Sequence, residues 1–474
     1  MDHAQQQPEN PTCCLDKNNA TTTLSNILWN MNTKPRVSSD VAHAIVQRAA
    51  AKINAISLNQ KKPVLARFHL DEIAVGQLLG TGGFSSVFEI TRLWLEPTTT
   101  EFTREEEEAR EALVERTRSC RRSLVAKVLQ DTLPLQPRAF ANAAVDLVLE
   151  AEFLSRLDHA HICKIRGTSA LGYRGYASGD FDGFFVLLDR LEETLSERIA
   201  RWRRQSRQWN RWGKLLLDRH GRKRKRLLVE RLQIAADIAS AMAYLHENGV
   251  ILRDLKPNNI GFDADGNVKV FDFGLCRQIC RTDEEDEAYY MSPAVGTVRY
   301  MAPEVLCEER YNFKADVYSY TTVLYDMLCL ERRRQRHKKA NNDKDETRST
   351  QEERHHQRRR RHDHSRICPS WPLEIRLLLQ RGWSQNHEER PSMKEILCTL
   401  QTVLQEMEEE EENEPDLRKS VNRQRSSRNP IAIHDSNHHA RSKDDEKGNK
   451  SCWSWRTTTL TTTERTLSSE LIQP

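Results

Sequence analysis

Three short polar motifs between residues 252 and 304 contain the side chains most able to do chemistry. Residues 252–259 hold an aspartate, a lysine and two asparagines, residues 272–274 begin with another aspartate, and residues 302–304 end with a glutamate. Phosphoryl transfer requires little covalent chemistry from a protein, because the catalyst mainly positions the reactants and neutralises charge on the phosphoryl oxygens. A few acids, a base and a lysine are sufficient for this task. The order of the three motifs therefore favours phosphoryl transfer.

The motifs resemble the catalytic segment of eukaryotic protein kinases in their order and spacing. The resemblance implies that Asp254 accepts the proton of the substrate hydroxyl and that Lys256 meets the transferred phosphate. It also implies that ATP is the phosphate donor and that Mg2+ is held by Asn259 and Asp272. We therefore expect an α+β, bilobal protein-kinase fold, with a small β-rich N-lobe and a larger helical C-lobe.

A glycine-rich stretch lies upstream, between two apolar runs that predict strands at residues 73–79 and 87–90. Glycine has no Cβ, so the backbone can approach phosphates closely and turn its amides toward their oxygens. The stretch resembles the glycine-rich loop of kinases, although Ser85 stands where a third glycine is usual. With the expected hinge after the apolar strand at residues 183–189, the resemblance assigns ATP binding to Leu79, Gly80, Thr81, Gly82, Gly83, Phe84, Val87, Ala126, Lys127, Asp189 and Leu191.

Lys127 resembles the kinase lysine that contacts the nucleotide phosphates and forms an ion pair with an acid on the next helix. The apolar pattern predicts this helix at residues 143–157. Both Glu150 and Glu152 lie in it. Glu150 precedes His159 by the interval that is usual in the family, so we assign the ion pair to Glu150. Loss of activity on changing Glu152, but not Glu150, would contradict this assignment.

Two further positions depart from the family pattern. Leu252 replaces the histidine that usually precedes the arginine and the catalytic aspartate, and an apolar side chain there can still pack against Phe273 and Leu154. Gly261 stands where kinases usually place an aliphatic residue under the adenine ring, which concerns adenine affinity more than catalysis. These positions motivate an alternative function, that of a nucleotide-binding pseudokinase or scaffold that binds a partner through its basic insertions.

Lys256 and Thr297 resemble the serine/threonine branch of the family, and the resemblance implies that Thr297 hydrogen-bonds near the catalytic aspartate. Tyrosine or dual specificity is the alternative. Arg253 matches the arginine that grips a phosphate on the activation segment, and Ser292 lies nearest the usual phosphosite, one residue off. The acidic residues 283–286 could instead neutralise Arg253, because carboxylates pair with arginine as phosphates do. The other candidate acceptors are Thr282, Tyr289, Tyr290 and Thr297.

The composition is that of a protein with one large domain. Of 474 residues, 38% are hydrophobic and 30% are charged, which is enough to bury the core of one two-lobed domain. No run approaches the roughly 18 apolar residues of a membrane helix, and residues 1–10 lack the apolar core of a signal peptide. The eleven cysteines form no disulfide-like framework. We expect a monomeric protein of the cytoplasm, the nucleus or both, with free thiols.

Composition divides the chain into three parts. Residues 1–67 predict a disordered arm with one short helix, residues 68–405 the kinase domain, and residues 406–474 an acidic block with a disordered tail. The bases of the charged stretches within the domain could bind an acidic or polyanionic partner or act as nuclear import signals, although charge runs are usually only solvated. These stretches predict insertions at about residues 91–122, 201–228 and 331–366.

Overall fold

The computed structural model of the chain describes residue 24 and residues 36–58, 62–97, 102–119, 123–211, 222–279, 296–330 and 367–413. All of these belong to the unit Met1–Asn413. The predicted insertion at residues 331–366, the candidate phosphosite Ser292 and the chain after residue 413 lie outside the described residues.

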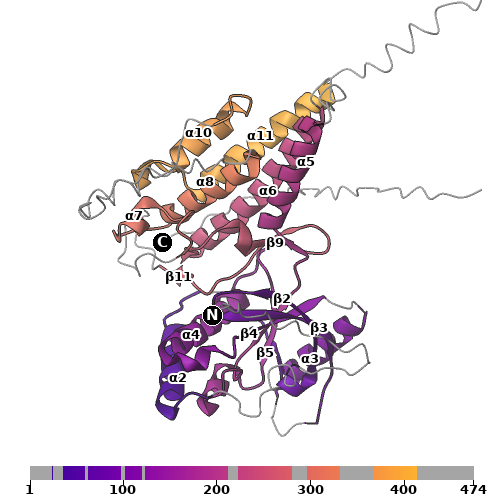
Figure 1. The fold of residues 1–474 in the computed structure, drawn as a ribbon, viewed down its shortest axis with the longest axis vertical. Helices are drawn as coiled ribbons and strands as arrows, with labels where there is room; N and C mark the ends of the chain where they lie inside the picture. The colour runs from indigo at the N-terminus through magenta and orange to yellow at the C-terminus, as the bar shows by residue number, and fades with distance from the viewer. Residues whose placement is uncertain are drawn as a thin grey trace, which may run out of the picture. The chain divides into compact units, whose positions relative to one another are not determined.

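A six-stranded sheet forms the smaller lobe (Figure 1). Neighbouring strands run antiparallel except β1 and β5, which are parallel. Side chains alternate between the faces of a strand. Along β4, Val125 and Leu129 accordingly join one hydrophobic core while Leu124 and Ala126 join another. In spatial order the strands are β1 (Ala66–Phe68), β5 (Ile165–Ser169), β6 (Val186–Asp189), β4 (Leu124–Leu129), β3 (Ser85–Leu93) and β2 (Ile73–Thr81).

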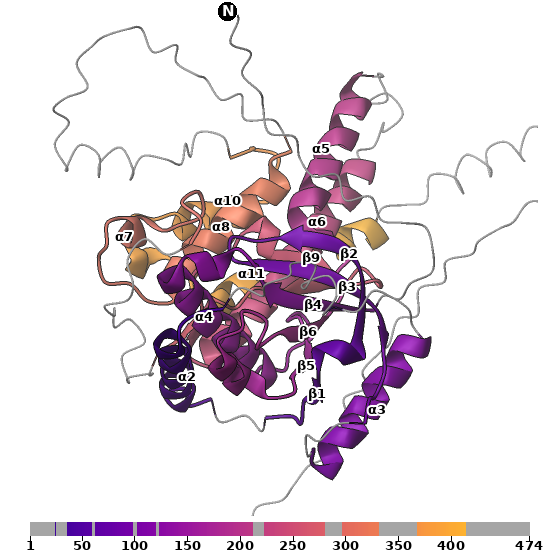
Figure 2. The same cartoon turned by 60° about the horizontal axis from the view of Figure 1, so that its bottom comes forward.

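Each face of this sheet is covered by a different helix. The helix α4 (Pro137–Arg156) contributes to the core that contains Val125, whereas α3 (Arg104–Ser119) contributes Leu113 and Val114 to the other core. Figure 2 shows α4 and α3 on opposite sides of the strands. The helix α3 lies within the stretch that the sequence predicts as an insertion, and it is therefore a packed part of the lobe.

The larger lobe is helical and is built around α8. Every residue of α8 from Ala315 to Leu328 is buried, as expected of a helix that anchors the catalytic loop. Arg390 and Glu304 form a buried pair in this lobe, with two hydrogen bonds of 2.6 and 2.8 Å. The helices of this lobe are α5 (Leu195–Arg211), α6 (Arg222–Glu247), α7 (Pro303–Leu306), α8 (Lys314–Leu328), α10 (Leu373–Gly382) and α11 (Met393–Asn413).

Short strands position the catalytic segment between the helices. The strand β7 (Glu193–Thr194) pairs with β9 (Ile260–Phe262), which pairs with β10 (Val268–Val270). The strand β8 (Val250–Ile251) pairs with β11 (Arg277–Gln278). A small β-rich lobe and a larger helical lobe match the architecture expected from the sequence.

The charged stretches are more helical than the sequence analysis suggested. The helices α5 and α6 extend into the stretch at residues 201–228, and α11 extends through the acidic block to Asn413. Arginine, lysine and glutamate are good helix formers, so a helix can continue through them without an apolar face. A salt bridge of 2.9 Å between Lys225 and Glu410 joins one basic stretch to the acidic one.

Candidate active site

The backbone of the catalytic loop is anchored on a buried carboxylate of α8. Asp316 accepts the backbone N–H of Leu252 at 2.8 Å and that of Arg253 at 2.9 Å. Arg253 has a φ of 70°, in the left-handed region, where a residue other than glycine is strained by about 1–3 kcal/mol. The two hydrogen bonds stabilise this strained backbone immediately before Asp254.

The carboxylate of Asp254 is fixed through both of its oxygens. Oδ1 accepts the backbone N–H and the hydroxyl of Thr297, at 2.9 and 3.0 Å. Oδ2 accepts Nζ of Lys256 at 2.5 Å and Nδ2 of Asn259 at 3.1 Å. The chain passes this close because residue 296 is a glycine with a φ of 112°, where a Cβ would lie 2.6 Å from the carbonyl oxygen of Arg253. Candidate residues from separate parts of the sequence therefore contact one carboxylate.

A second cluster joins Lys127 of β4 to Glu150 of α4 and to Asp272. Nζ of Lys127 lies 2.8 and 2.6 Å from the two oxygens of Glu150 and 3.2 Å from Oδ1 of Asp272. Burial alone lowers the pKa of Lys127, but the charges of Glu150 and Asp272 outweigh it and raise that pKa above its usual value. The charge of Lys127 in turn lowers the pKa of Asp272. The site therefore keeps an ammonium and a carboxylate charged side by side.

The two acids considered as partners of Lys127 have different contacts. Glu150 contacts Lys127, whereas Glu152 accepts Nζ of Lys62 at 2.7 Å and Nε of Arg156 at 2.8 Å. Two residues along an α-helix are about 200° apart around its axis. Glu150 and Glu152 therefore serve opposite sides of α4, and the structure brings Lys127 together with the acid that the sequence analysis assigned to it.

The glycine-rich loop joins β2 to β3 and is open on one side. The N–H of Gly82 donates to the carbonyl of Ser85 at 2.7 Å, and the side chain of Gln130 donates to the carbonyl of Gly82 at 2.9 Å. A Cβ placed on Gly80 or Gly83 would meet no atom within 4 Å. Glycines are therefore not needed there for internal packing, and the space beside them suits a loop that a phosphate group approaches closely.

The position under the expected adenine ring has a compensating residue. A Cβ on Gly261 would lie 2.7 Å from Cδ1 of Leu191, so the leucine of the hinge occupies the space that an aliphatic residue at 261 would need. On the other side, Ala126 and Leu188 are buried. The side chain of Leu191, a residue that the sequence analysis assigned to ATP binding, therefore fills the space left by the missing side chain at Gly261.

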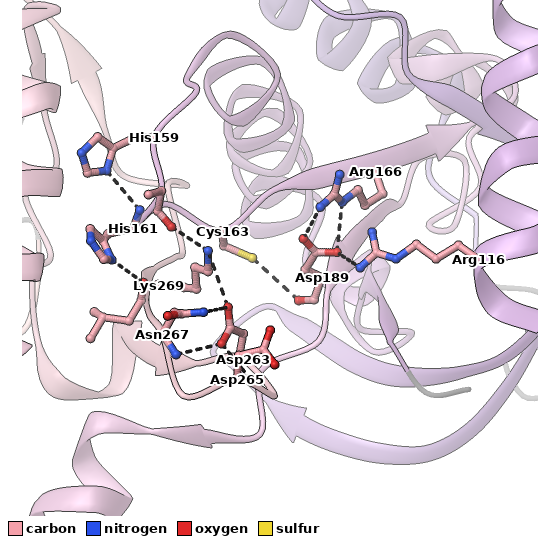
Figure 3. Close-up of polar contacts among 12 residues, drawn as sticks. Arg116, His159, His161, Cys163, Arg166, Asp189, Asp263, Asp265, Asn267 and Lys269 are labelled. Carbon is pink, nitrogen blue, oxygen red and sulfur yellow. Dashed lines mark hydrogen bonds and ion pairs between the residues drawn. The ribbon is translucent and has the colours of Figure 1, made fainter. Parts of the chain in front are cut away.

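Asp189 at the start of the hinge is gripped by two arginines, as Figure 3 shows. Arg166 of β5 donates to both carboxylate oxygens, at 3.0 and 2.7 Å, and Arg116 of α3 donates to Oδ1 at 2.7 Å. The next residue, Arg190, donates to the buried carboxylate of Glu89 on β3. The side chains of these two hinge residues thus tie them to the sheet, and their backbone N–H groups donate to the carbonyls of Lys164 and Ser123, at 3.1 and 2.9 Å.

The replaced histidine and the regulatory arginine have defined environments. Leu252 is buried in the same core as Phe273 and Leu154, so an apolar residue suits that position. Nε of Arg253 donates to the carbonyl of Leu275 at 2.6 Å, and Nη1 reaches the hydroxyl of Tyr311 at 3.5 Å. Thr297 is described, while the other candidate acceptors of the segment lie outside the described residues.

The donor set near Asp254 fits a magnesium ion. Nδ2 of Asn259 is committed to the backbone and side chain of Asp254, at 3.0 and 3.1 Å, which leaves its amide oxygen for a cation. Asp272 adds a carboxylate, and Mg2+ favours such oxygen ligands together with phosphate oxygens. In the part of the chain that the structure describes, no group of three or more His, Cys, Asp or Glu residues could hold a metal, so the phosphates would complete the coordination.

Several residues of the site were not predicted from the sequence. Arg116 and Arg166, which contact the hinge, and Lys62, which pairs with Glu152 of α4, belong to no motif. Leu191 was assigned to ATP binding, but its place beside Gly261 was not predicted. The only available signal was apolar spacing around them, such as Leu113 and Val114 near Arg116, which indicates that a helix packs but does not say against what.

Comparison with known proteins identifies the family. The family described as protein kinase domain matches residues 137–400, more than half of the chain. Serine/threonine-protein kinase STY46 of Arabidopsis thaliana is 32% identical over 180 residues, which are 38% of this chain and 28% of that protein. Serine/threonine-protein kinase TNNI3K of Mus musculus is 35% identical over 195 residues, which are 40% of this chain and 22% of that protein. The chain belongs to the protein kinase family, as its motifs suggested.

The relatives also set limits. The chain spans less than a third of the length of these two kinases. The family match begins at residue 137, after the glycine-rich loop and Lys127, and the placement of that part of the site therefore comes from the structure. Among the described residues, none of the helices combines the length and the apolar composition needed to cross a membrane.

Proposed function

We propose that the protein is an ATP-dependent kinase that transfers the γ-phosphate to serine and threonine hydroxyls of protein substrates. The observation that supports this most strongly is the single carboxylate of Asp254, which Thr297, Lys256 and Asn259 contact together. A base of this kind must be held in place beside the hydroxyl that loses its proton. The assembled pair of Lys127 and Glu150 supplies the second requirement, a cation for the phosphates.

Each residue of the site then has a defined task. Asp254 accepts the proton from the substrate hydroxyl, while its hydrogen bonds keep the carboxylate in one orientation. Lys256, already 2.5 Å from Asp254, places a positive charge where the transferred group passes. Lys127 orients the phosphates, and Glu150 orients Lys127. Asn259 and Asp272 would hold Mg2+, which would supply positive charge to neutralise the phosphate oxygens. The glycine-rich loop, Ala126 and the hinge at Asp189 and Leu191 hold the nucleotide.

Specificity for serine and threonine rests on Lys256 and Thr297. Both side chains contact Asp254, so the feature that resembles the serine/threonine branch is part of the catalytic hydrogen-bond network. The printed names of the relatives are consistent with this choice. The pseudokinase alternative was motivated by Leu252 and Gly261. Leu252 is buried among apolar residues and Leu191 fills the space beside Gly261, so neither position now favours that alternative.

Regulation and partners extend the proposal. Arg253 would bind a phosphate on the activation segment, with Ser292 as the first candidate acceptor. The basic insertions would bind an acidic or polyanionic partner or direct the protein to the nucleus, and Lys225, which pairs with Glu410, shows that such bases can also serve the fold. We propose a monomer of the cytoplasm, the nucleus or both, with a kinase domain at residues 68–405.

The test is phosphate transfer from ATP by the purified full chain to a generic basic protein in the presence of Mg2+. We expect incorporation that disappears when Mg2+ is chelated. Hydrolysis of the labelled product should release phosphoserine and phosphothreonine. Phosphotyrosine as the main product would contradict the assigned specificity, and absence of any incorporation would favour the pseudokinase alternative.

A further inference from the structure

The described part of the chain before β1 packs on the outer side of α4. The helix α2 (Ser39–Asn54) lies alongside α4 (Figure 2), and its residues Ile45 and Ala49 are fully buried in the core to which α4 belongs. Nη2 of Arg48 donates to Oδ1 of Asn142 on α4 at 3.0 Å. The sequence analysis placed this helix in the arm at residues 1–67, and its residues Ile45 and Ala49 lie in the same hydrophobic core as α4. We call residues 36–58 together with Lys62 the clasp segment.

The clasp segment continues past the second half of α4. Ile56 and Leu58 are buried, and their carbonyls lie 3.5 and 3.4 Å from Nη1 of Arg156. Lys62 then pairs with Glu152 at 2.7 Å. Contacts thus run from Asn142 to Arg156, along most of the helix that carries Glu150, and the contact at Glu152 lies on the side opposite to Lys127.

The same segment also contacts the larger lobe. The backbone N–H of Ser57 donates to Oε1 of Gln278 at 2.7 Å. Gln278 belongs to β11, which pairs with β8 directly before the catalytic loop. Lys52 of this segment and Arg253 of the catalytic loop both act on Asp146 of α4. Burial raises the pKa of Asp146, and the positive charges of Lys52 and Arg253 oppose that rise. One segment therefore joins α4 to the strand pair that precedes Asp254.

We propose that the clasp segment positions α4 for catalysis, so that Glu150 stays in contact with Lys127. The inference rests on the proposed kinase function. An α-helix that is attached to a lobe by one face can shift, and a misplacement of about 1 Å at a reacting group can cost on the order of 100-fold in rate. Lys62, Ile45 and Ala49 are positioning residues in this account, because they act on the phosphates only through Glu150 and Lys127. The segment lies outside residues 137–400, which the family match covers.

The test uses one substitution at two positions of α2. Ala49→Arg places a long charged side chain in the buried contact with α4, whereas Ala44→Arg places it on the exposed side of the same helix. We expect Ala49→Arg to lower kcat by about tenfold or more, with Ala44→Arg within about twofold of the unchanged protein. Amide hydrogen exchange of α2 verifies that the first variant has released the helix.

A second readout does not depend on kinase activity. The full chain is labelled with a small amine-reactive reagent, and the labelling rate of Lys127 is measured by mass spectrometry. The side chain of Lys127 is 12% exposed and its ammonium contacts both carboxylate oxygens of Glu150, so release of Glu150 exposes the amine to the reagent. We expect faster labelling of Lys127 in Ala49→Arg and no change in Ala44→Arg.

The outcomes separate this inference from the proposed function. An inactive unchanged protein would refute the kinase proposal, while the labelling of Lys127 would still decide on the clasp segment. Release of α2 with unchanged kcat and unchanged labelling would overturn the inference. If Ala49→Arg does not fold, the labelling of Lys127 is compared between Lys62→Met and the control variant Lys164→Met. Lys164 pairs with Asp158 at 2.8 Å, against 2.7 Å for Lys62 with Glu152. Equal labelling of Lys127 in the two variants would overturn the inference.

Discussion

The catalytic loop and the outer surface of the smaller lobe hold the site in different ways. Around Asp254 the contacts come from residues of recognisable motifs, namely Lys256, Asn259 and Thr297. Around α4 and the hinge they come from elements without motifs, such as α2 and α3, which use ion pairs with partly exposed arginines and lysines. The comparison teaches that the groups expected to do chemistry belong to recognisable motifs, whereas the elements that position two of them do not.

The largest expected difference between the regions is one of stability. Glu304→Ala leaves Arg390, which is 1% exposed, as a buried charge without its carboxylate partner, which should cost about 3–5 kcal/mol of unfolding free energy. Glu152→Ala on the outer surface should cost less, because Lys62 has a side chain that is 49% exposed and stays solvated. Urea unfolding of both variants measures the difference. Equal losses would show that the two regions are equally dependent on their ion pairs.

The next prediction tests whether Leu191 of the hinge fills the space of the side chain that is missing at Gly261. Gly261→Leu forces its side chain against Leu191, 2.7 Å away, and overpacking of about 1–3 kcal/mol should raise the KM for ATP about tenfold or more. The double variant Gly261→Leu with Leu191→Gly should recover most of this affinity, because the two side chains have exchanged places. A double variant that binds ATP no better than Gly261→Leu would show that the two positions are not coupled.

The smallest effect concerns the contact of α3 with the hinge. Arg116→Met removes one of the two arginines on Asp189, and the remaining arginine keeps two hydrogen bonds. We expect the KM for ATP to rise about two- to fivefold with kcat nearly unchanged, since a partly exposed pair contributes about 0.2–1 kcal/mol. Arg118→Met is the control, because Arg118 pairs only locally with the exposed Glu115. Equal kinetic constants for the two variants would show that α3 does not help to position the hinge.

The sequence predicted those features that depend on local spacing. The strands around the glycine-rich loop and the helix with Glu150 follow from apolar periodicity and motif order. The contact of Thr297 with Asp254 followed from the resemblance, because glycine at 296 permits the close passage that the motif requires.

Other features depend on packing between distant segments. The spacing of Val41, Ile45, Ala49 and Ile53 predicts a helix, but an apolar stripe does not identify the surface that it covers. The place of Leu191 beside Gly261 depends on the three-dimensional path of the hinge. The extension of α5 and α6 through basic residues was missed because charge runs were interpreted as solvated loops. The domain boundaries at residues 67 and 405 and the phosphosite at Ser292 stay predictions.

The central claim is that Asp254 is the base of a phosphoryl transfer, and its exchange for asparagine tests this most directly. Asp254→Asn keeps the size of the side chain and removes the carboxylate, while Asp158→Asn makes the same change at an exposed residue that pairs with Lys164. We predict that Asp254→Asn lowers kcat for a protein substrate by about 100-fold or more, within the range of general base catalysis, and that Asp158→Asn leaves it unchanged. Turnover by Asp254→Asn at the rate of Asp158→Asn would contradict the account.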